Sequence, residues 1–326
     1  MLKFLKRTKD EPRPGPQIAP SPRHVDANAL LARVQWTSAR YLNGLLQGNY
    51  RTLFRGSGVM FTDIRAYETS DDVRHIDWNV TARMQTPYVR QYEQDRELTA
   101  WFLLDLSASI DFGSEHKRKR DVAAEAIATL GHLLRRHGNR VGLLIDRGAA
   151  HLDVLPARNS QKHLLSLLRQ ILTAPIQTNS TRTDLSVLLQ RANRIIKQRS
   201  TIFLVSDFYT TPGWQTPLTG LASRHDVIAL RLVDPIEQTL PDMGMLIMRD
   251  SETGEQVFVD SGDERFRKRF ADAAQAHLAS LMTTFAQAGV DCLELSTHET
   301  TEAALIRFIH AREQLLRRSS QGKSRA

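Results

Sequence analysis

Residues 99–109 read TAWFLLDLSAS, an apolar run of strand length that ends in Asp105. Ser107 and Ser109 follow this carboxylate at a spacing of two. A strand of nearly continuous apolar residues is typical of a parallel sheet that is buried on both faces. The same pattern puts one carboxylate and two hydroxyls in a single loop at the end of the strand, where their oxygens can converge on a hard cation.

Strands and helices are expected to alternate after residue 99. Such alternation predicts an α/β fold of the Rossmann-like type, with a mostly parallel sheet and helices on both faces. A hairpin is expected over 245–260, because two apolar runs flank a turn signal there. The expected strands are 99–105, 140–145, 150–155, 200–206, 226–233 and 290–295, and the expected helices are 115–137, 160–172, 184–198, 214–224, 263–288 and 300–316.

Composition is that of an ordinary globular protein. The 326 residues are 41% hydrophobic and 25% charged. The single cysteine rules out a disulfide within the chain and favours a reducing compartment. No apolar run approaches the roughly 20 residues of a membrane-spanning helix, and the N-terminus lacks the apolar core of a signal peptide. We therefore expect a soluble, cytoplasmic protein.

The net charge of +8 is concentrated in the two ends of the chain. Basic residues outnumber acidic ones six to two over 1–24 and six to one over 306–326, which leaves the body nearly neutral. Residues 1–24 are also rich in proline and are expected to be a disordered tail, and 317–326 a second basic tail. Binding to nucleic acid or to an anionic surface is thus an alternative confined to the tails.

Two further strand ends carry oxygen ligands. Thr183 lies in a loop that opens a helix, and Asp207 directly follows the apolar strand 200–206. The carboxyl ends of neighbouring parallel strands meet at one edge of a sheet, where ligands bind in open α/β folds. Two carboxylates and several hydroxyls suit Mg²⁺ or Mn²⁺. The competing interpretation is that these Asp and Ser residues only cap helices.

Residues 25–98 form a distinct region. A helix is expected to begin near Asp26, with Leu31 and Val34 on its apolar face. Residues 51–98 alternate charged and aromatic residues, and we expect this polar, strand-rich segment to pack on the sheet. Five of its residues either form a partner or phosphate site or an internal salt-bridge network that fastens the segment. They are Arg65, Arg74, Asp77, Trp78 and Arg83.

A run of five basic residues, 116–120, opens the first helix after Asp105. Positive charge is unfavourable at a helix N-terminus, so the run is either a surface for an acidic partner or a solvated helix start. The sequence slightly favours the solvated start.

These motifs together resemble two known groups of proteins. Asp105, Ser107, Ser109, Thr183 and Asp207 resemble the metal-ion-dependent adhesion site of von Willebrand factor A domains. The segment before them resembles domain-of-unknown-function family 58, and that likeness covers roughly residues 50–316. It rests on the motifs GSG at 56–58, FTDIRAY at 61–67, DDVRHIDW at 71–78, TAR at 81–83, YVRQYE at 88–93, DP at 234–235 and ETG at 252–254.

The resemblance implies a fold, a site and a function. Asp105, Ser107 and Ser109 would face the metal, Thr183 would bind directly or through water, and Asp207 through water. An open metal position would then receive a partner's carboxylate. Two departures are Arg182 and Phe208, which stand where many such domains have glycine.

The expected function is non-enzymatic. The resemblance implies an interaction module that acts with a MoxR-type AAA+ ATPase in chaperone-like assembly or maturation of an unknown client. The alternative from another class is a Mg²⁺- or Mn²⁺-dependent hydrolase built on Asp105 and Asp207. No base is obvious beside these residues, and the chain has no Walker phosphate loop.

Overall fold

A six-stranded sheet forms the centre of the protein. The computed structural model describes residues 26–37, 64–68, 73, 76, 78–90, 98–114, 117–147, 151–175, 184–249 and 255–323. The strand order is β10-β7-β6-β3-β4-β5, and every neighbouring pair is parallel except β4 and β5. The strands are β3 (Thr99–Asp105), β4 (Arg140–Asp146), β5 (Leu152–Arg158), β6 (Thr201–Ser206), β7 (Asp226–Val233) and β10 (Asp291–Ser296). The predicted mostly parallel sheet is therefore confirmed.

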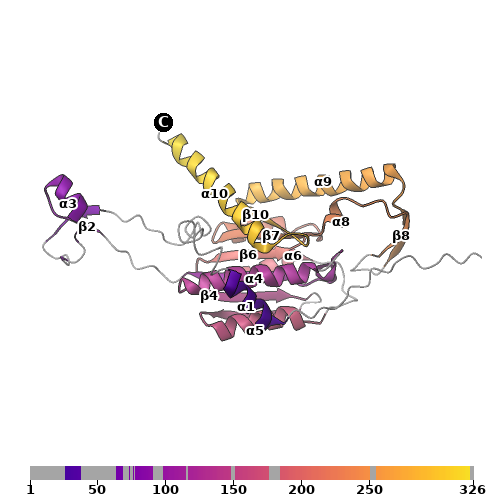
Figure 1. Cartoon of the computed structure of the whole chain (residues 1–326), viewed down its shortest axis with the longest axis horizontal. Coiled ribbons are helices and arrows are strands. Elements are labelled where there is room, and N and C mark those ends of the chain that lie inside the picture. The colour runs from indigo at the N-terminus through magenta and orange to yellow at the C-terminus, as the bar shows by residue number, and fades with distance from the viewer. Residues whose placement is uncertain are drawn as a thin grey trace, which may run out of the picture.

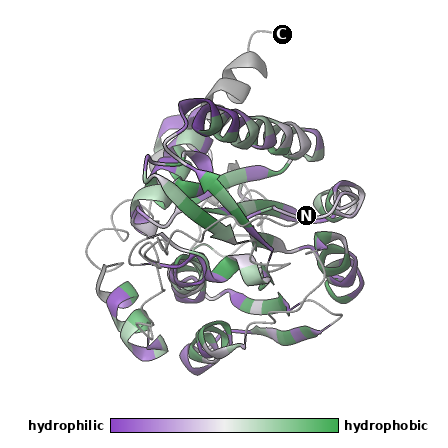
Figure 2. Cartoon of the chain, turned by 90° about the vertical axis from the view of Figure 1, so that its right-hand side faces the viewer, coloured by the Kyte–Doolittle hydropathy of each residue, from purple (hydrophilic) through white to green (hydrophobic). Residues whose placement is uncertain are grey.

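Helices cover both faces of this sheet (Figure 1). One core cluster joins the sheet to α1 (Ala27–Thr37), α4 (Lys119–Arg136), α5 (Gln161–Thr173) and α10 (Thr301–Lys323). A second cluster joins the other face to α6 (Leu185–Ile195), α7 (Gln215–Ala222) and α9 (Glu264–Ala288). Figure 2 shows the apolar residues concentrated on the strands and on the helix surfaces that face them.

Helix α6 illustrates how the sequence produces this packing. Leu185, Leu188, Leu189 and Ala192 recur at helical spacing, and all four are buried against the sheet. Asp184 caps the helix because its side chain accepts a hydrogen bond from the backbone N–H of Ser186.

The N-terminal helix is fastened to the domain by both apolar and ionic contacts. The apolar face of α1 packs on α4 and α5. The guanidinium of Arg33 pairs with Glu125 of α4, a carboxylate that also contacts the Lys117 ammonium at 3.0 Å and the Thr301 hydroxyl at 3.3 Å. Helices from both ends of the chain thus meet on one side chain of α4.

The described part of the segment before the sheet does not pack as the sequence predicted. It consists of β1 (Ile64–Ala66), α3 (Trp78–Met84) and β2 (Tyr88–Arg90), and β1 pairs antiparallel with β2. Figure 1 shows α3 and β2 apart from the sheet. Trp78 is 71% exposed and Met84 58%, so the apolar side chains at the two ends of α3 face solvent.

A second small sheet projects beside α9. Strands β8 (Met245–Arg249) and β9 (Gln256–Asp260) form an antiparallel hairpin that follows the short helix α8 (Pro235–Gln238). Ile247 and Phe258 lie opposite each other and are 55% and 72% exposed. Among the described residues, no helix has the length and hydropathy to span a membrane.

Candidate metal-ion site at the carboxyl edge of the sheet

Asp105 lies at the centre of the candidate site. It ends β3 and is buried, and its Oδ2 accepts a hydrogen bond from the Ser206 hydroxyl at 2.8 Å. Its Oδ1 accepts from the backbone N–H of Ser107 at 3.1 Å. Burial, and then the negative charge of Asp207, raise the pKa of Asp105 to about 7. These surroundings therefore disfavour the negatively charged form of the Asp105 carboxyl group.

The two serines form the next part of the site. Ser107 is extended and leads into a short 3₁₀ helix, η3 (Ala108–Asp111). The hydroxyls of Ser107 and Ser109 lie 3.0 Å apart, and the Ser109 hydroxyl is also hydrogen-bonded to Asp207. The structure thus brings four of the five predicted ligands together: Asp105, Ser107, Ser109 and Asp207.

The fifth predicted ligand, Thr183, lies outside the described residues, as does Arg182. The chain is described again from Asp184. Just beyond it, the Leu185 backbone N–H donates to the Thr210 hydroxyl at 3.1 Å, which ties the start of α6 to the loop after β6. This is the loop that carries Asp207.

Asp207 is buried and has a cationic partner of its own. The Lys119 ammonium nitrogen lies 2.9 Å from its Oδ2, and the Tyr209 backbone N–H donates to its Oδ1 at 3.2 Å. Burial by itself would raise the pKa of Asp207, but the Lys119 charge and the hydrogen bonds from Lys119, Ser109 and Tyr209 together outweigh it, so the pKa lies below its usual value. Asp207 is therefore ionised in the folded protein.

Lys119 is the functional-site residue that sequence reasoning missed. The side chain is 0% exposed, and its ammonium also contacts Glu237 Oε1 at 2.6 Å and lies 5.8 Å from the centre of the Phe112 ring. The signal was present in the sequence: Lys119 shares a helical stripe with Val122, Ala126 and Leu130. A lysine on an apolar stripe indicates a buried, paired cation.

The predicted solvated helix start at 116–120 is accordingly wrong for its described members. Arg120 is buried and pairs with Asp111 at 2.7 Å. Arg118 pairs with Asp121 at 3.1 Å, and Lys117 pairs with Glu125. These basic side chains form ion pairs with acidic side chains of the same domain. The ion pairs offset the unfavourable position of positive charge at the start of a helix. His116 lies outside the described residues.

Phe208 does not crowd the site. Its φ of 63° is left-handed, the conformation for which glycine is favoured at this position. The ring is buried in the second core cluster, 5.0 Å from Phe285 and 5.8 Å from Trp214 between ring centres. The strained backbone is thus held in place by aromatic packing on the α9 side of the sheet.

Glu237 and Asp234 extend the polar network along the sheet edge. Asp234 follows β7 and is fully buried, and its Oδ2 accepts from the Ser114 backbone N–H and from the Thr297 hydroxyl, each at 2.8 Å. Glu237 reaches back to the Asp234 backbone N–H at 3.3 Å, which makes a capping box at the start of α8. Carboxylates thus follow β3, β6 and β7 at one edge.

The other residues singled out from the sequence do not join this group. Trp78 and Arg83 are exposed on α3, which lies apart from the sheet (Figure 1). Arg65 lies in β1, whereas Arg74 and Asp77 are outside the described residues. Neither interpretation of this set, a partner site or a salt-bridge network, is tested by the described residues.

The donor set fits Mg²⁺ or Mn²⁺ and does not fit zinc. Within the described ranges, no group of three or more His, Cys, Asp and Glu side chains is arranged to hold a metal ion. Coordination would therefore have to combine the Asp105 carboxylate with hydroxyl oxygens and water, which is typical of Mg²⁺. The raised pKa of Asp105 agrees with this, because a bound cation would supply the positive charge that the buried carboxyl group lacks.

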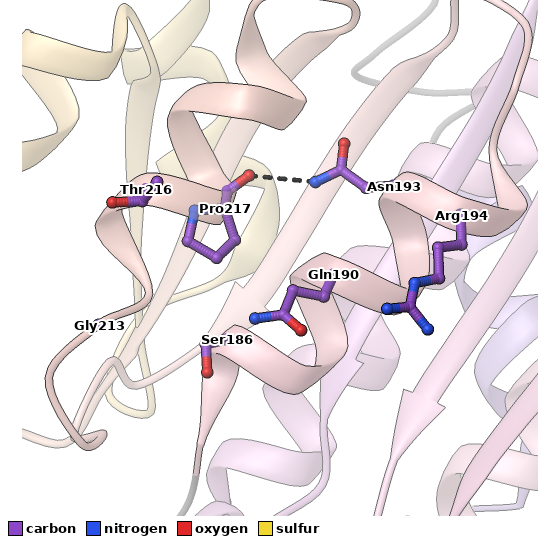
Figure 3. Close-up of a pocket in the computed structure, with 7 residues that line it drawn as sticks. All are labelled: Ser186, Gln190, Asn193, Arg194, Gly213, Thr216 and Pro217. Carbon is purple, nitrogen blue, oxygen red and sulfur yellow. Dashed lines mark hydrogen bonds between the residues drawn. The ribbon is translucent and has the colours of Figure 1, made fainter.

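A polar cleft of about 540 Å³ lies between α6 and α7 (Figure 3). One side carries Ser186, Gln190 and Arg194 of α6, and the other carries Thr216 and Pro217 of α7. The Asn193 amide bridges the two helices by donating to the Pro217 carbonyl at 3.2 Å. No carboxylate or histidine lines this cleft. The cleft is therefore separate from the candidate metal site, which is built on Asp105 and Asp207.

The family model described as "Protein of unknown function DUF58" matches residues 63–280. The chain belongs to the DUF58 family. An uncharacterized protein of Mycobacterium tuberculosis is 39% identical to this DUF58 chain over 87% of the chain and 89% of the relative. An uncharacterized protein of Mycobacterium bovis matches over the same shares with the same identity.

Solved structures give weaker likenesses. The hypothetical protein BatB from Bacteroides thetaiotaomicron is 15% identical, with a TM-score of 0.41 over 67% of this chain and 99% of BatB. The VWA domain of SpRpn10 is 12% identical, with a TM-score of 0.37 over 66% of this chain and 94% of that domain.

Proposed function

We propose that this DUF58 protein is a binding module whose metal-dependent site receives a carboxylate from a partner protein. The observation that carries the proposal is the pair of buried carboxylates, Asp105 and Asp207, at the ends of the adjacent parallel strands β3 and β6. The Ser107 and Ser109 hydroxyls lie beside them. This arrangement has the donor types of a metal-ion-dependent adhesion site.

The residues would have different roles at such a site. Asp105, Ser107 and Ser109 would hold Mg²⁺ or Mn²⁺ together with Thr183, and Asp207 would act through water. When bound, the metal supplies a Lewis-acidic position that a partner's Asp or Glu can occupy. Ser206 orients Asp105 through its hydroxyl, and the Ser107 backbone N–H fixes the other carboxylate oxygen.

The proposed partner is a MoxR-type AAA+ ATPase, with which the module would act in assembly or maturation of a client protein. The resemblance of the sequence motifs to this family supports this choice. Asp105 and Ser107 are held by hydrogen bonds within the site, and no described histidine contacts either of them. The site is therefore proposed to bind rather than to cleave.

A pull-down of the cognate ATPase tests the proposal. Asp105→Asn keeps the shape of the side chain but removes its charge and replaces one accepting oxygen by an NH₂ donor, so capture in Mg²⁺ should fall at least about tenfold. Asp272→Asn, on the exposed surface of α9, is the matched control and should capture the ATPase like wild type. Addition of EDTA should reduce wild-type capture to the level of Asp105→Asn.

Two results would overturn the proposal. Capture that survives both Asp105→Asn and EDTA would show that the edge of the sheet is not the binding site. Loss of capture in Asp272→Asn as well would show that the charge change acts non-specifically.

A further inference from the structure

Lys119 places a fixed positive charge among the carboxylates of the candidate site. Its side chain is fully buried, and its ammonium contacts Asp207 and Glu237. The basic residues on either side of Lys119 in the sequence are already paired, because Arg118 and Arg120 contact Asp111. Lys119 therefore compensates the charges of Asp207, after β6, and of Glu237, in α8.

The position of this charge matters for any metal bound at Asp105. Ser109 links the two halves of the site, because its hydroxyl contacts both Ser107 and Asp207. Asp207 would therefore face the metal on one side and the Lys119 ammonium on the other. Like charges in a buried, poorly screened environment repel strongly, so the ammonium and a divalent cation compete for the same carboxylate.

Charge balance gives the direction of the effect. Asp105, Asp207 and Glu237 are three carboxyl groups, and Lys119 supplies one positive charge among them. Neutralising Lys119 would leave Asp207 and Glu237 without their cation and would make the site more attractive to a divalent ion.

We propose that Lys119 is a built-in counter-ion that weakens Mg²⁺ binding at Asp105 by holding Asp207. This inference rests on the proposed metal site. Lys119 is a positioning residue, because it acts on the metal through Asp207. A weakly held metal would be retained chiefly when a partner's carboxylate completes its coordination, so metal and partner would bind together.

Calorimetric titration of the full chain with Mg²⁺, repeated with Mn²⁺, tests the inference. Lys119→Met removes the charge and keeps the apolar bulk, and Lys119→Gln also keeps an N–H donor for the carboxylates. Each should tighten binding about tenfold or more. Lys117→Met is the matched control, because Lys117 lies two residues away and pairs with Glu125; it should bind metal like wild type. If Lys119→Met does not fold, as judged by circular dichroism, Lys119→Gln decides the result.

The outcomes separate this inference from the proposed metal site. Metal binding to wild type that is unchanged or weaker in both Lys119 variants overturns the inference and leaves the metal site standing. Binding that appears only in the Lys119 variants supports the inference and overturns metal binding by the native protein. Absence of binding in all proteins overturns both.

Discussion

The Phe208 ring packs edge-on against Phe285 of α9, with ring centres 5.0 Å apart and an angle of 79° between the rings. This contact holds residue 208 in a left-handed backbone conformation that a phenylalanine adopts only at a cost. The loop that carries Asp207 is thus held in position by the second core cluster, which lies between the sheet and α6, α7 and α9.

Phe208→Ala should destabilise the protein by about 3–5 kcal/mol, because it removes a buried aromatic ring and leaves the backbone strain. Phe208→Gly should be about 1 kcal/mol less destabilising, although glycine is smaller, because glycine adopts a positive φ without strain. Urea unfolding of both variants checks the order. A glycine variant that is the less stable of the two would contradict the strain argument.

Lys119→Met should destabilise the protein by about 3–5 kcal/mol in the absence of metal, because Asp207 and Glu237 would lose their buried partner. Adding Asp207→Asn to that variant should restore part of the loss, since one unpaired charge is then removed. Denaturant unfolding measures both effects. Lys117→Met is the control and should cost less than about 1 kcal/mol, because its ion pair is partly exposed. Equal losses at positions 117 and 119 would contradict the prediction.

His132 should make the free energy of unfolding depend on pH. Burial, and then Arg135 and Arg136, lower the pKa of this α4 side chain from 6.5 to about 4. Between these values the unfolded chain binds more protons than the folded one, so stability should fall as the pH falls from about 6.5 toward 4. Above about pH 6.5, His132 is neutral in both the folded and the unfolded chain, so it no longer lowers the free energy of unfolding.

Urea unfolding at pH 7, 6 and 5 measures this dependence. His132→Gln should remove the part of the fall in stability that is due to position 132, because glutamine does not titrate; Asp105, whose pKa is raised to about 7, contributes the opposite slope in both proteins. An identical pH dependence in wild type and His132→Gln would show that other groups account for the effect.

The β8–β9 hairpin should contribute little to stability. Ile247 and Phe258 are largely exposed, so Ile247→Ser and Phe258→Ser should each change the free energy of unfolding by no more than about 0.5 kcal/mol. Leu204→Ala in β6 is the contrasting control and should cost about 2–5 kcal/mol. Thermal or urea unfolding checks this. A decrease in the free energy of unfolding of more than about 1 kcal/mol in either serine variant would contradict the prediction, because it would mean that these side chains are buried against another part of the protein.

Much of the fold could be predicted from the sequence because local periodicity determines it. The leucines of α6 recur at helical spacing, and β3 is a continuous apolar run that ends in the candidate ligand Asp105. Parallel pairing of β3 with β6 then brings Asp105 close to Asp207, as the strand-end argument predicted.

The apolar stripe of α4 indicates that Lys119 is buried, but the identity of its ionic partners could not be derived in the same way. Its two partners, Asp207 and Glu237, lie 88 and 118 positions away in the sequence. Their proximity depends on the order of strands in the sheet, which short-range patterns do not encode. The surroundings of Phe208 are similar, because its ring packs on α9, whose position is set by the whole fold.

The hydrogen bond between Glu125 and Thr301 joins residues 176 positions apart. On a ribosome that adds about 5–20 residues per second, Thr301 would be made on the order of ten seconds after Glu125. The nascent chain can pair Arg33 and Lys117 with Glu125 early, but it must wait for α10 before this carboxylate is fully enclosed. Closure of the domain around α4 is therefore a late event of synthesis, and a chain that stops short of residue 301 lacks the helix that completes it.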